Sequence, residues 1–222
     1  PHDWYGAYSG SGIVKDGKLH LMYTGNTRDR DWNRRSFQCM AVMDAAGAVT
    51  KLPEPLIDHV PEGYTEHFRD PKVWKDPDLY RCVIGAQRED ATGTAVMYES
   101  SDLLNWRFAG EIKTGLKHFG YMWECPDFFP LGDQWVFLCS PMGAGERTTV
   151  YFVGDFDYRT GSFTYTVTGE ADWGFDFYAP QTFLDHRNRR IMVGWANEWD
   201  WMPFWKDWGP TWREGWCGSF AI

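Results

Sequence analysis

The sequence contains four segments that share one pattern, and this internal repeat restricts the fold more than any other feature. Each segment begins with a short polar motif, continues through an apolar stretch and a turn, and ends in a second apolar stretch. The four segments are YSGSGIVKDGKLHLMYTG, FRDPKVWKDPDLYRCVIGA, ECPDFFPLGDQWVFLCSP and YAPQTFLDHRNRRIMVGW. They start roughly 55 to 60 residues apart, a period typical of four-stranded propeller blades. The repeat therefore predicts about four blades of a β-propeller.

The apolar stretches within and between the repeats have the composition of β-strands. They are short and rich in Val, Tyr, Phe, Trp and Thr, and turn signals such as KDGK and DHRN separate them. No segment has a sustained helical period of apolar residues, so we predict an all-β chain. The innermost strands of a propeller line its central channel, and the polar motifs should converge at one mouth of it. The converging side chains would be Ser9, Arg69, Asp70, Glu124, Asp127, Tyr178 and Gln181.

Composition argues against several classes of protein. The net charge is −9, and no block of Lys and Arg could neutralise phosphates, so neither a nucleic acid nor an anionic membrane surface is an expected partner. No apolar run approaches the length of a membrane-spanning helix. The five cysteines form no CxxC pair, which indicates neither a zinc site nor a disulfide framework and slightly favours a reducing, cytoplasmic compartment. Aromatic residues make up 18% of the chain, more than a core requires, so some rings should face a ligand.

Glu124 stands in the stretch YMWECPDFF, flanked by Met122, Trp123, Phe128 and Phe129. Apolar surroundings desolvate a carboxyl group and raise its pKa. A carboxyl group with a raised pKa can donate a proton near neutral pH, as the general acid of glycoside hydrolysis does. In the alternative interpretation, ECPD is a turn that enters a strand, and Glu124 is hydrogen-bonded to a neighbouring arginine. From the residues alone, the two interpretations are equally supported.

A second acid, Asp70, follows Arg69 in the stretch HFRDPKVW. Pro71 restricts the backbone before it, and the neighbouring arginine keeps the carboxylate ionised. A fixed anion at this place could hold sugar hydroxyls and stabilise positive charge at a reacting carbon. An Asp-Pro turn with a surface ion pair would produce the same sequence pattern. Cys125, beside Glu124, could tune the hydrogen bonding of that acid or belong to the core.

In this order and at this spacing, the motifs resemble those of glycoside hydrolase family 32, which contains the invertases and sucrose-6-phosphate hydrolases. YSGSG is similar to the family's Phe-Ser-Gly-Ser motif, FRDPKV to its Arg-Asp-Pro motif and ECPD to its Glu-Cys motif. FYAPQTF, VGWANEW and REGWCGSFAI are similar to later segments. The resemblance runs along the whole chain and implies a five-bladed β-propeller. It also implies retaining hydrolysis of terminal β-D-fructofuranosides, such as sucrose, sucrose 6-phosphate or short fructans, without a metal or a cofactor.

The resemblance implies roles for individual residues as well. Glu124 would be the acid/base, and Asp70 would stabilise the transition state and hold fructosyl hydroxyls. The residues expected to contact the sugar are Tyr8, Ser9, Arg69, Cys125, Tyr178 and Trp195. The other tryptophans of the segment that follows Trp195 are expected to pack between blades. His67 and His118 lie near the two acidic motifs and could carry protons, although a structural role is more usual for a histidine.

One part of the family pattern is missing from residues 1–222. The family's nucleophile is an aspartate in an Asn-Asp-Pro-Asn motif, which does not occur here. Asp3 and Asp16 have the wrong neighbours, and KDPD at 75–78 falls in a hairpin turn. We expect residues 1–222 to be a catalytic propeller domain truncated at both ends, without the first-blade nucleophile strand and the C-terminal β-sandwich, and inactive alone. The alternatives are an inactive sugar-binding propeller, and a related five-bladed glycosidase or phosphorylase with another glycoside substrate.

Overall fold

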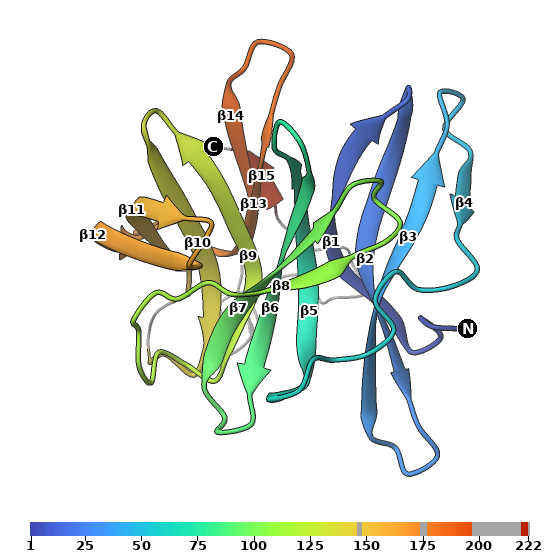
Figure 1. Ribbon diagram of the computed structural model, residues 1–222, viewed down its shortest axis with the longest axis horizontal. Coiled ribbons are helices and arrows are strands. Elements are labelled where there is room, and N and C mark those ends of the chain that lie inside the picture. Colours follow the sequence, from blue (N-terminus) through green and yellow to red (C-terminus); the bar gives the residue numbers. More distant parts are fainter. Residues whose placement is uncertain (146–147, 174–176, 197–218, 222) are drawn as a thin grey trace, which may run out of the picture.

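The structure is a computed structural model that describes residues 1–145, 148–173, 177–196 and 219–221. This described part consists of strands and their connections, which confirms the all-β prediction, and it has no helix that could span a membrane. The strands form four antiparallel sheets. In Figure 1 the first three sheets follow one another in chain order, from blue through green to yellow and orange.

Each sheet is a meander in which strands adjacent in sequence are hydrogen-bonded. The first contains β1 (Gly6–Lys15), β2 (Lys18–Arg28), β3 (Arg34–Met43) and β4 (Val49–Lys51). The second contains β5 (Tyr64–Lys75), β6 (Tyr80–Arg88), β7 (Gly93–Ser100) and β8 (Arg107–Glu111). The third contains β9 (Met122–Leu131), β10 (Gln134–Met142), β11 (Val150–Asp157) and β12 (Ser162–Glu170). The fourth contains β13 (Tyr178–Leu184), β14 (Arg190–Trp195) and β15 (Ser219–Ala221). Four-stranded meanders are the predicted blades, while the count of five blades stays a prediction.

The predicted turn signals lie where the strands reverse. Asp16 and Gly17 join β1 to β2 with φ angles of 51° and 73°, a left-handed backbone that suits the twist of a two-residue hairpin. In the KDPD stretch, Lys75 ends β5 and the next three residues lie in the turn before β6, as expected. Between β13 and β14, the Asp185 carboxylate accepts hydrogen bonds from the backbone N–H groups of Arg187 and Arg189, both at 2.9 Å. Local turn chemistry therefore sets the register of these hairpins.

The aromatic residues of the third sheet form a core with the second sheet. Trp123 and Phe128 are almost fully buried there, together with Phe137 and Phe152, against Val83 of β6. Aromatic rings that pack in pairs stabilise a core by about 0.5–1.5 kcal/mol per pair beyond the free energy of burying their apolar surface. Much of the aromatic content of these two sheets is therefore core.

The four polar motifs occupy equivalent points on β1, β5, β9 and β13, the first strands of the sheets, which lie beside one another. At each motif the strand register shifts, which marks a bulge. In three of the motifs the residue before the proline has a left-handed backbone, with φ angles of 66° at Asp70, 46° at Cys125 and 52° at Ala179. This conformation costs about 1–3 kcal/mol in a non-glycine residue and is concentrated at functional sites. The bulges re-aim the motif side chains away from the regular alternation of the strand.

When the motifs are aligned as YSGS, RDPK, ECPD and YAPQ, the fourth residue of a motif connects its sheet to the next one. Ser11 Oγ, in the first sheet, donates a hydrogen bond to Pro71 O in the second at 2.9 Å. Lys72 Nζ, in the second sheet, contacts the carboxylate of Asp127 in the third at 3.2 Å. That carboxylate also accepts a hydrogen bond from the backbone N–H of Thr182 in the fourth sheet at 2.7 Å. These contacts fix the first strands relative to one another.

Replacing Lys72 with methionine should lower the free energy of unfolding by about 3–5 kcal/mol, because Asp127 would keep a buried charge without its cation. Equilibrium unfolding in urea measures the loss. Arg159→Met is the matched control, since Arg159 pairs with Asp157 on the surface and should contribute no more than about 1 kcal/mol. Equal losses in the two variants would contradict the assignment of Lys72 as a connector between sheets.

Candidate active site

Residues of all four motifs line one cavity of about 830 Å³. The eight residues predicted as catalytic or sugar-binding are all in its wall: Tyr8, Ser9, Arg69, Asp70, Glu124, Cys125, Tyr178 and Trp195. They come from β1, β5, β9, β13 and β14, so the fold brings together side chains that are far apart in the sequence. A volume of this size lies within the range of about 300–1,000 Å³ that is usual for small-molecule sites.

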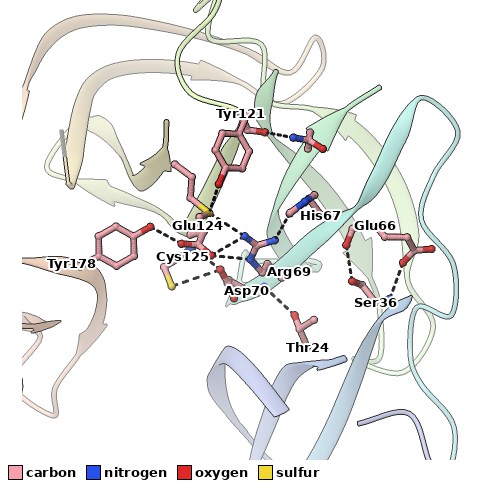
Figure 2. A network of polar contacts seen from close by, with 12 residues as sticks. Thr24, Ser36, Glu66, His67, Arg69, Asp70, Tyr121, Glu124, Cys125 and Tyr178 are labelled. Atoms are coloured by element: carbon pink, nitrogen blue, oxygen red, sulfur yellow. Dashed lines mark hydrogen bonds and ion pairs between the residues drawn. The ribbon is translucent and has the colours of Figure 1, made fainter. Parts of the chain in front are cut away.

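The two acidic motifs are cross-linked by their own neighbours, as Figure 2 shows. Arg69, which precedes Asp70, donates two hydrogen bonds to Glu124 Oε1, from Nε at 3.0 Å and from Nη2 at 2.7 Å. Cys125, which follows Glu124, donates its backbone N–H to Asp70 Oδ2 at 2.9 Å. Each carboxylate is therefore held by the other motif, and the two acids lie in the same wall of the cavity.

The surroundings of Glu124 differ from those predicted. Besides the arginine, its Oε2 accepts a hydrogen bond from the hydroxyl of Tyr178. The four apolar neighbours in the sequence do not line the cavity; they are buried within the sheets: Met122, Trp123, Phe128 and Phe129. The expected apolar setting of this carboxyl group was therefore wrong, because its partners come from other strands, while Trp123 and Phe128 are buried in one core cluster and Phe129 in another. The alternative interpretation was right about the arginine and wrong about a turn, since ECPD lies within β9.

Asp70 is buried, with 5% of its surface exposed, so the alternative of a surface ion pair in an Asp-Pro turn is wrong. Its backbone N–H donates to Thr24 Oγ1 at 2.9 Å, and Thr24 donates in turn to Gln38 Oε1 at 2.8 Å. Burial raises the pKa of Asp70 to about 6, with the Glu124 charge adding to the effect and the Arg69 guanidinium opposing it. The residue is a carboxylate above that pH.

The stability of the protein should depend on pH through Asp70. Since its pKa rises from 3.8 to about 6 on folding, the folded state binds more protons than the unfolded chain between these values. Stability therefore falls as the pH rises through this window. Asp70→Asn removes the dependence, so its free energy of unfolding relative to wild type should increase by about 2–3 kcal/mol between pH 4 and pH 7. Urea unfolding at both pH values tests this, and a difference that stays constant would contradict it.

Tyr178 and Cys125 support the two acids. Burial raises the pKa of the Tyr178 phenol, and the Glu124 carboxylate raises it further, so the hydroxyl stays protonated and donates. Burial also raises the pKa of the Cys125 thiol well above its usual range. Its Sγ lies 3.7 Å from Asp70 Oδ2, so this thiol contacts the second acid as a neutral group.

Two residues expected at the mouth of the channel do not line the cavity. Asp127 is fully buried and forms the contacts between sheets described above. Gln181 Nε2 donates to the backbone carbonyl oxygens of Cys125 and Pro126 at 2.9 and 3.2 Å, which joins β13 to β9. Both follow the bulge of their motif and turn toward the neighbouring sheet. Their role in the structure is to hold the first strands together.

The cavity also contains residues that the sequence analysis did not select: Ala7, Arg34, His67, Tyr121, Met142 and Ala179. His67 Nδ1 lies 3.1 Å from Arg69 Nη1, and burial together with the nearby arginines lowers the pKa of His67 to about 4. This histidine is neutral at pH 7 and accepts a hydrogen bond from the arginine that holds Glu124. From its position in HFRDP, His67 was expected near this motif, as a possible proton carrier or, more usually, in a structural role. His118 lines a different cavity.

Several features named from the sequence fall outside the described residues. They include the tryptophans after Trp195, within 197–218, and Cys217 of REGWCGSFAI. The other four cysteines, Cys39, Cys82, Cys125 and Cys139, are buried free thiols. Among the described residues, no group of three or more His, Cys, Asp or Glu side chains is arranged to hold a metal ion.

The whole chain, residues 1–222, matches the family described as "Glycosyl hydrolases family 32 N-terminal domain". The chain belongs to glycoside hydrolase family 32. It is 46% identical over 210 residues to the sucrose-6-phosphate hydrolase of Bacillus subtilis, covering 88% of this chain and 43% of that protein. It is 37% identical over 233 residues to the sucrose-6-phosphate hydrolase of Pediococcus pentosaceus, covering 100% of this chain and 45% of that protein. The chain thus spans less than half the length of these family 32 relatives.

Solved family 32 structures share the fold. The sucrose-6-phosphate hydrolase from Lactobacillus gasseri superposes with a TM-score of 0.84 at 33% identity, covering 93% of this chain and 44% of that chain. A Bombyx mori family 32 β-fructofuranosidase variant in complex with sucrose superposes with a TM-score of 0.83 at 33% identity, covering 97% of this chain and 47% of that chain. These comparisons confirm the resemblance inferred from the motifs and the propeller fold that it implied.

Proposed function

We propose that the complete protein that carries this chain hydrolyses terminal β-D-fructofuranosides, with sucrose or sucrose 6-phosphate as the main substrate and short fructans as a further class. One observation carries the proposal: the Arg69–Asp70 and Glu124–Cys125 dipeptides hold each other in the wall of one cavity. In a member of a glycoside hydrolase family, two carboxyl groups with separate environments suit the two roles that glycoside cleavage requires.

In this proposal, Glu124 is the acid and then the base of a retaining double displacement. An aspartate from outside residues 1–222 attacks C2 of the fructosyl unit, the bond from C2 to the glycosidic oxygen breaks, and Glu124 gives its proton to that oxygen. Water then attacks C2, Glu124 takes a proton from the water, and the bond from C2 to the aspartate breaks. Arg69 and Tyr178 fix the two oxygens of Glu124 before the substrate binds, which supports this assignment by pre-organising the carboxyl group.

Asp70 has a different role, as the stabiliser of the transition state. Positive charge develops on the fructosyl ring as the glycosidic bond breaks, and a fixed carboxylate stabilises such charge best where water is excluded. The backbone N–H of Cys125 holds Oδ2, and we assign Oδ1 to the hydroxyl groups of the sugar. Tyr8, Ser9 and Trp195 would complete the contacts with the sugar, the tryptophan through the apolar face of the ring.

The deciding experiment is an assay of the complete gene product with sucrose and with sucrose 6-phosphate. Release of fructose is the expected result, whereas residues 1–222 alone should release none. Calorimetry with sucrose and fructose runs in parallel. Binding without hydrolysis would favour the sugar-binding propeller, an alternative that the missing nucleophile motif supports. Cleavage of arabinosides or mannosides without cleavage of fructosides would favour the other class of five-bladed glycosidase.

A further inference from the structure

Among the residues that the structure describes, one arginine of the cavity has no acidic partner. Arg34 is the first residue of β3, lines the cavity and is half-buried. Its guanidinium lies 6.0 Å from the centre of the Tyr8 ring and makes no hydrogen bond or ion pair within the part of the chain that the structure describes. Arg69, the other arginine of the cavity, is paired with Glu124. The positive charge of Arg34 is therefore available to a ligand.

A second arginine strengthens this charge. Arg28 lies directly opposite Arg34 in the register of β2 and β3, so the two side chains share one face of the sheet. Like charges at such a position repel each other and destabilise the sheet. Arg28 stacks on Tyr5, with its guanidinium 4.6 Å from the ring centre, and its buried Nε has no hydrogen-bond partner among the described residues. An anion between the two guanidinium groups would remove the repulsion.

Arg35, the next residue of β3, differs from Arg34 because it forms ion pairs. Arg35 contacts the carboxylates of Asp29 and Glu66 at 3.7 and 3.3 Å. Successive side chains of a strand point to opposite faces, so these acids lie on the face of Arg35 and do not neutralise Arg34. The whole chain carries a net charge of −9, yet Arg28 and Arg34 form no ion pair with an acid in the described part of the chain. Burial, Arg69 and Arg28 lower the pKa of Arg34, while Tyr8 and the more distant Glu124 carboxylate partly oppose them.

We propose that Arg34, with Arg28 behind it, binds the phosphate group of a phosphorylated sugar and makes the cavity selective for a fructoside that carries a phosphate ester. Arginine forms paired, charge-assisted hydrogen bonds with phosphate oxygens, and these contacts are stronger than those with neutral hydroxyl groups. The inference rests on the proposed fructosidase function, because the substrate that Arg34 selects is the one that Glu124 and Asp70 cleave.

The test compares the complete wild-type protein with Arg34→Gln and with the control Arg35→Gln. The measured quantity is the ratio of kcat/KM for sucrose 6-phosphate to kcat/KM for sucrose. Arg34→Gln should lower this ratio about 10- to 100-fold, mainly through KM, since it removes charge-assisted hydrogen bonds. Arg35→Gln should leave the ratio unchanged, because Arg35 is not in the cavity wall. Arg34→Lys, which keeps the charge and loses the paired geometry, should recover part of the ratio.

A second measurement uses inorganic phosphate as an inhibitor of sucrose hydrolysis. It should compete with substrate in the wild type, and its inhibition constant should rise in Arg34→Gln. An equal loss with both substrates in Arg34→Gln would overturn the inference, and so would an unchanged ratio. If the wild type cleaves neither substrate, the proposed fructosidase function is wrong. Calorimetry then tests the role of Arg34 independently, by comparing the binding of sucrose 6-phosphate to the wild type and to Arg34→Gln.

Discussion

Replacing Glu124 with glutamine should lower kcat for fructose release by the complete protein by at least about 10²-fold. Positioned acid catalysis contributes about 10²–10⁴ in rate, and a carboxamide can neither give a proton to the leaving oxygen nor take one from water. Glutamine keeps the size of the side chain and can still accept the hydrogen bond from Arg69. The fold and substrate binding should therefore persist. Steady-state kinetics with sucrose and sucrose 6-phosphate measure the loss.

The chain offers a closely matched control in Glu111. This glutamate also pairs with an arginine, Arg88, and also accepts a hydrogen bond from a tyrosine hydroxyl, that of Tyr64 at 3.1 Å. It does not line the cavity that contains Glu124. Glu111→Gln should therefore leave kcat within a few-fold of wild type. A loss of kcat seen only in Glu124→Gln would then show that Glu124 takes part in the chemical step. If Glu124→Gln keeps kcat within tenfold of wild type, Glu124 is not the acid.

Asp70→Asn should lower kcat by about 10²–10³-fold with a much smaller change in KM, because the lost charge acts mainly in the transition state. Asparagine Oδ1 can still accept the hydrogen bond from the backbone N–H of Cys125, so the local structure should be kept. Asp76→Asn is the control, since Asp76 pairs with Arg81 and does not line the cavity. A change confined to KM would show that Asp70 binds substrate and transition state equally, contrary to its proposed role.

The placement of the candidate site could be predicted because the chain contains four repeated segments. Equivalent motifs in successive sheets lie at equivalent points on adjacent first strands, so Ser9, Asp70, Cys125 and Ala179 meet without any long-range information in the sequence. The family motifs selected eight side chains, and all eight line one cavity. Residues that face the cavity from outside the motifs were not predictable in this way. Arg34 is the first residue of β3, and none of the four repeated motifs contains it.

Three further features needed the three-dimensional structure. The motif alone does not show that the bulge turns Asp127 and Gln181 toward the neighbouring sheet, so both were expected in the channel. The sequence neighbours of Glu124 suggested an apolar setting, yet its contacts come from other strands. The outer strands β4 and β8 are short and mostly exposed, so no alternating apolar pattern in the sequence predicts them.

A crystal structure of the complete protein carrying Glu124→Gln, with sucrose or sucrose 6-phosphate bound, tests the central claim most directly. We predict a fructosyl ring in the cavity, with the residue 124 carboxamide within about 2.6–3.2 Å of the glycosidic oxygen. The Asp70 carboxylate should accept hydrogen bonds from the ring hydroxyls in the same complex. A sugar bound away from these two side chains, or a glycosidic oxygen out of reach of residue 124, would contradict the account.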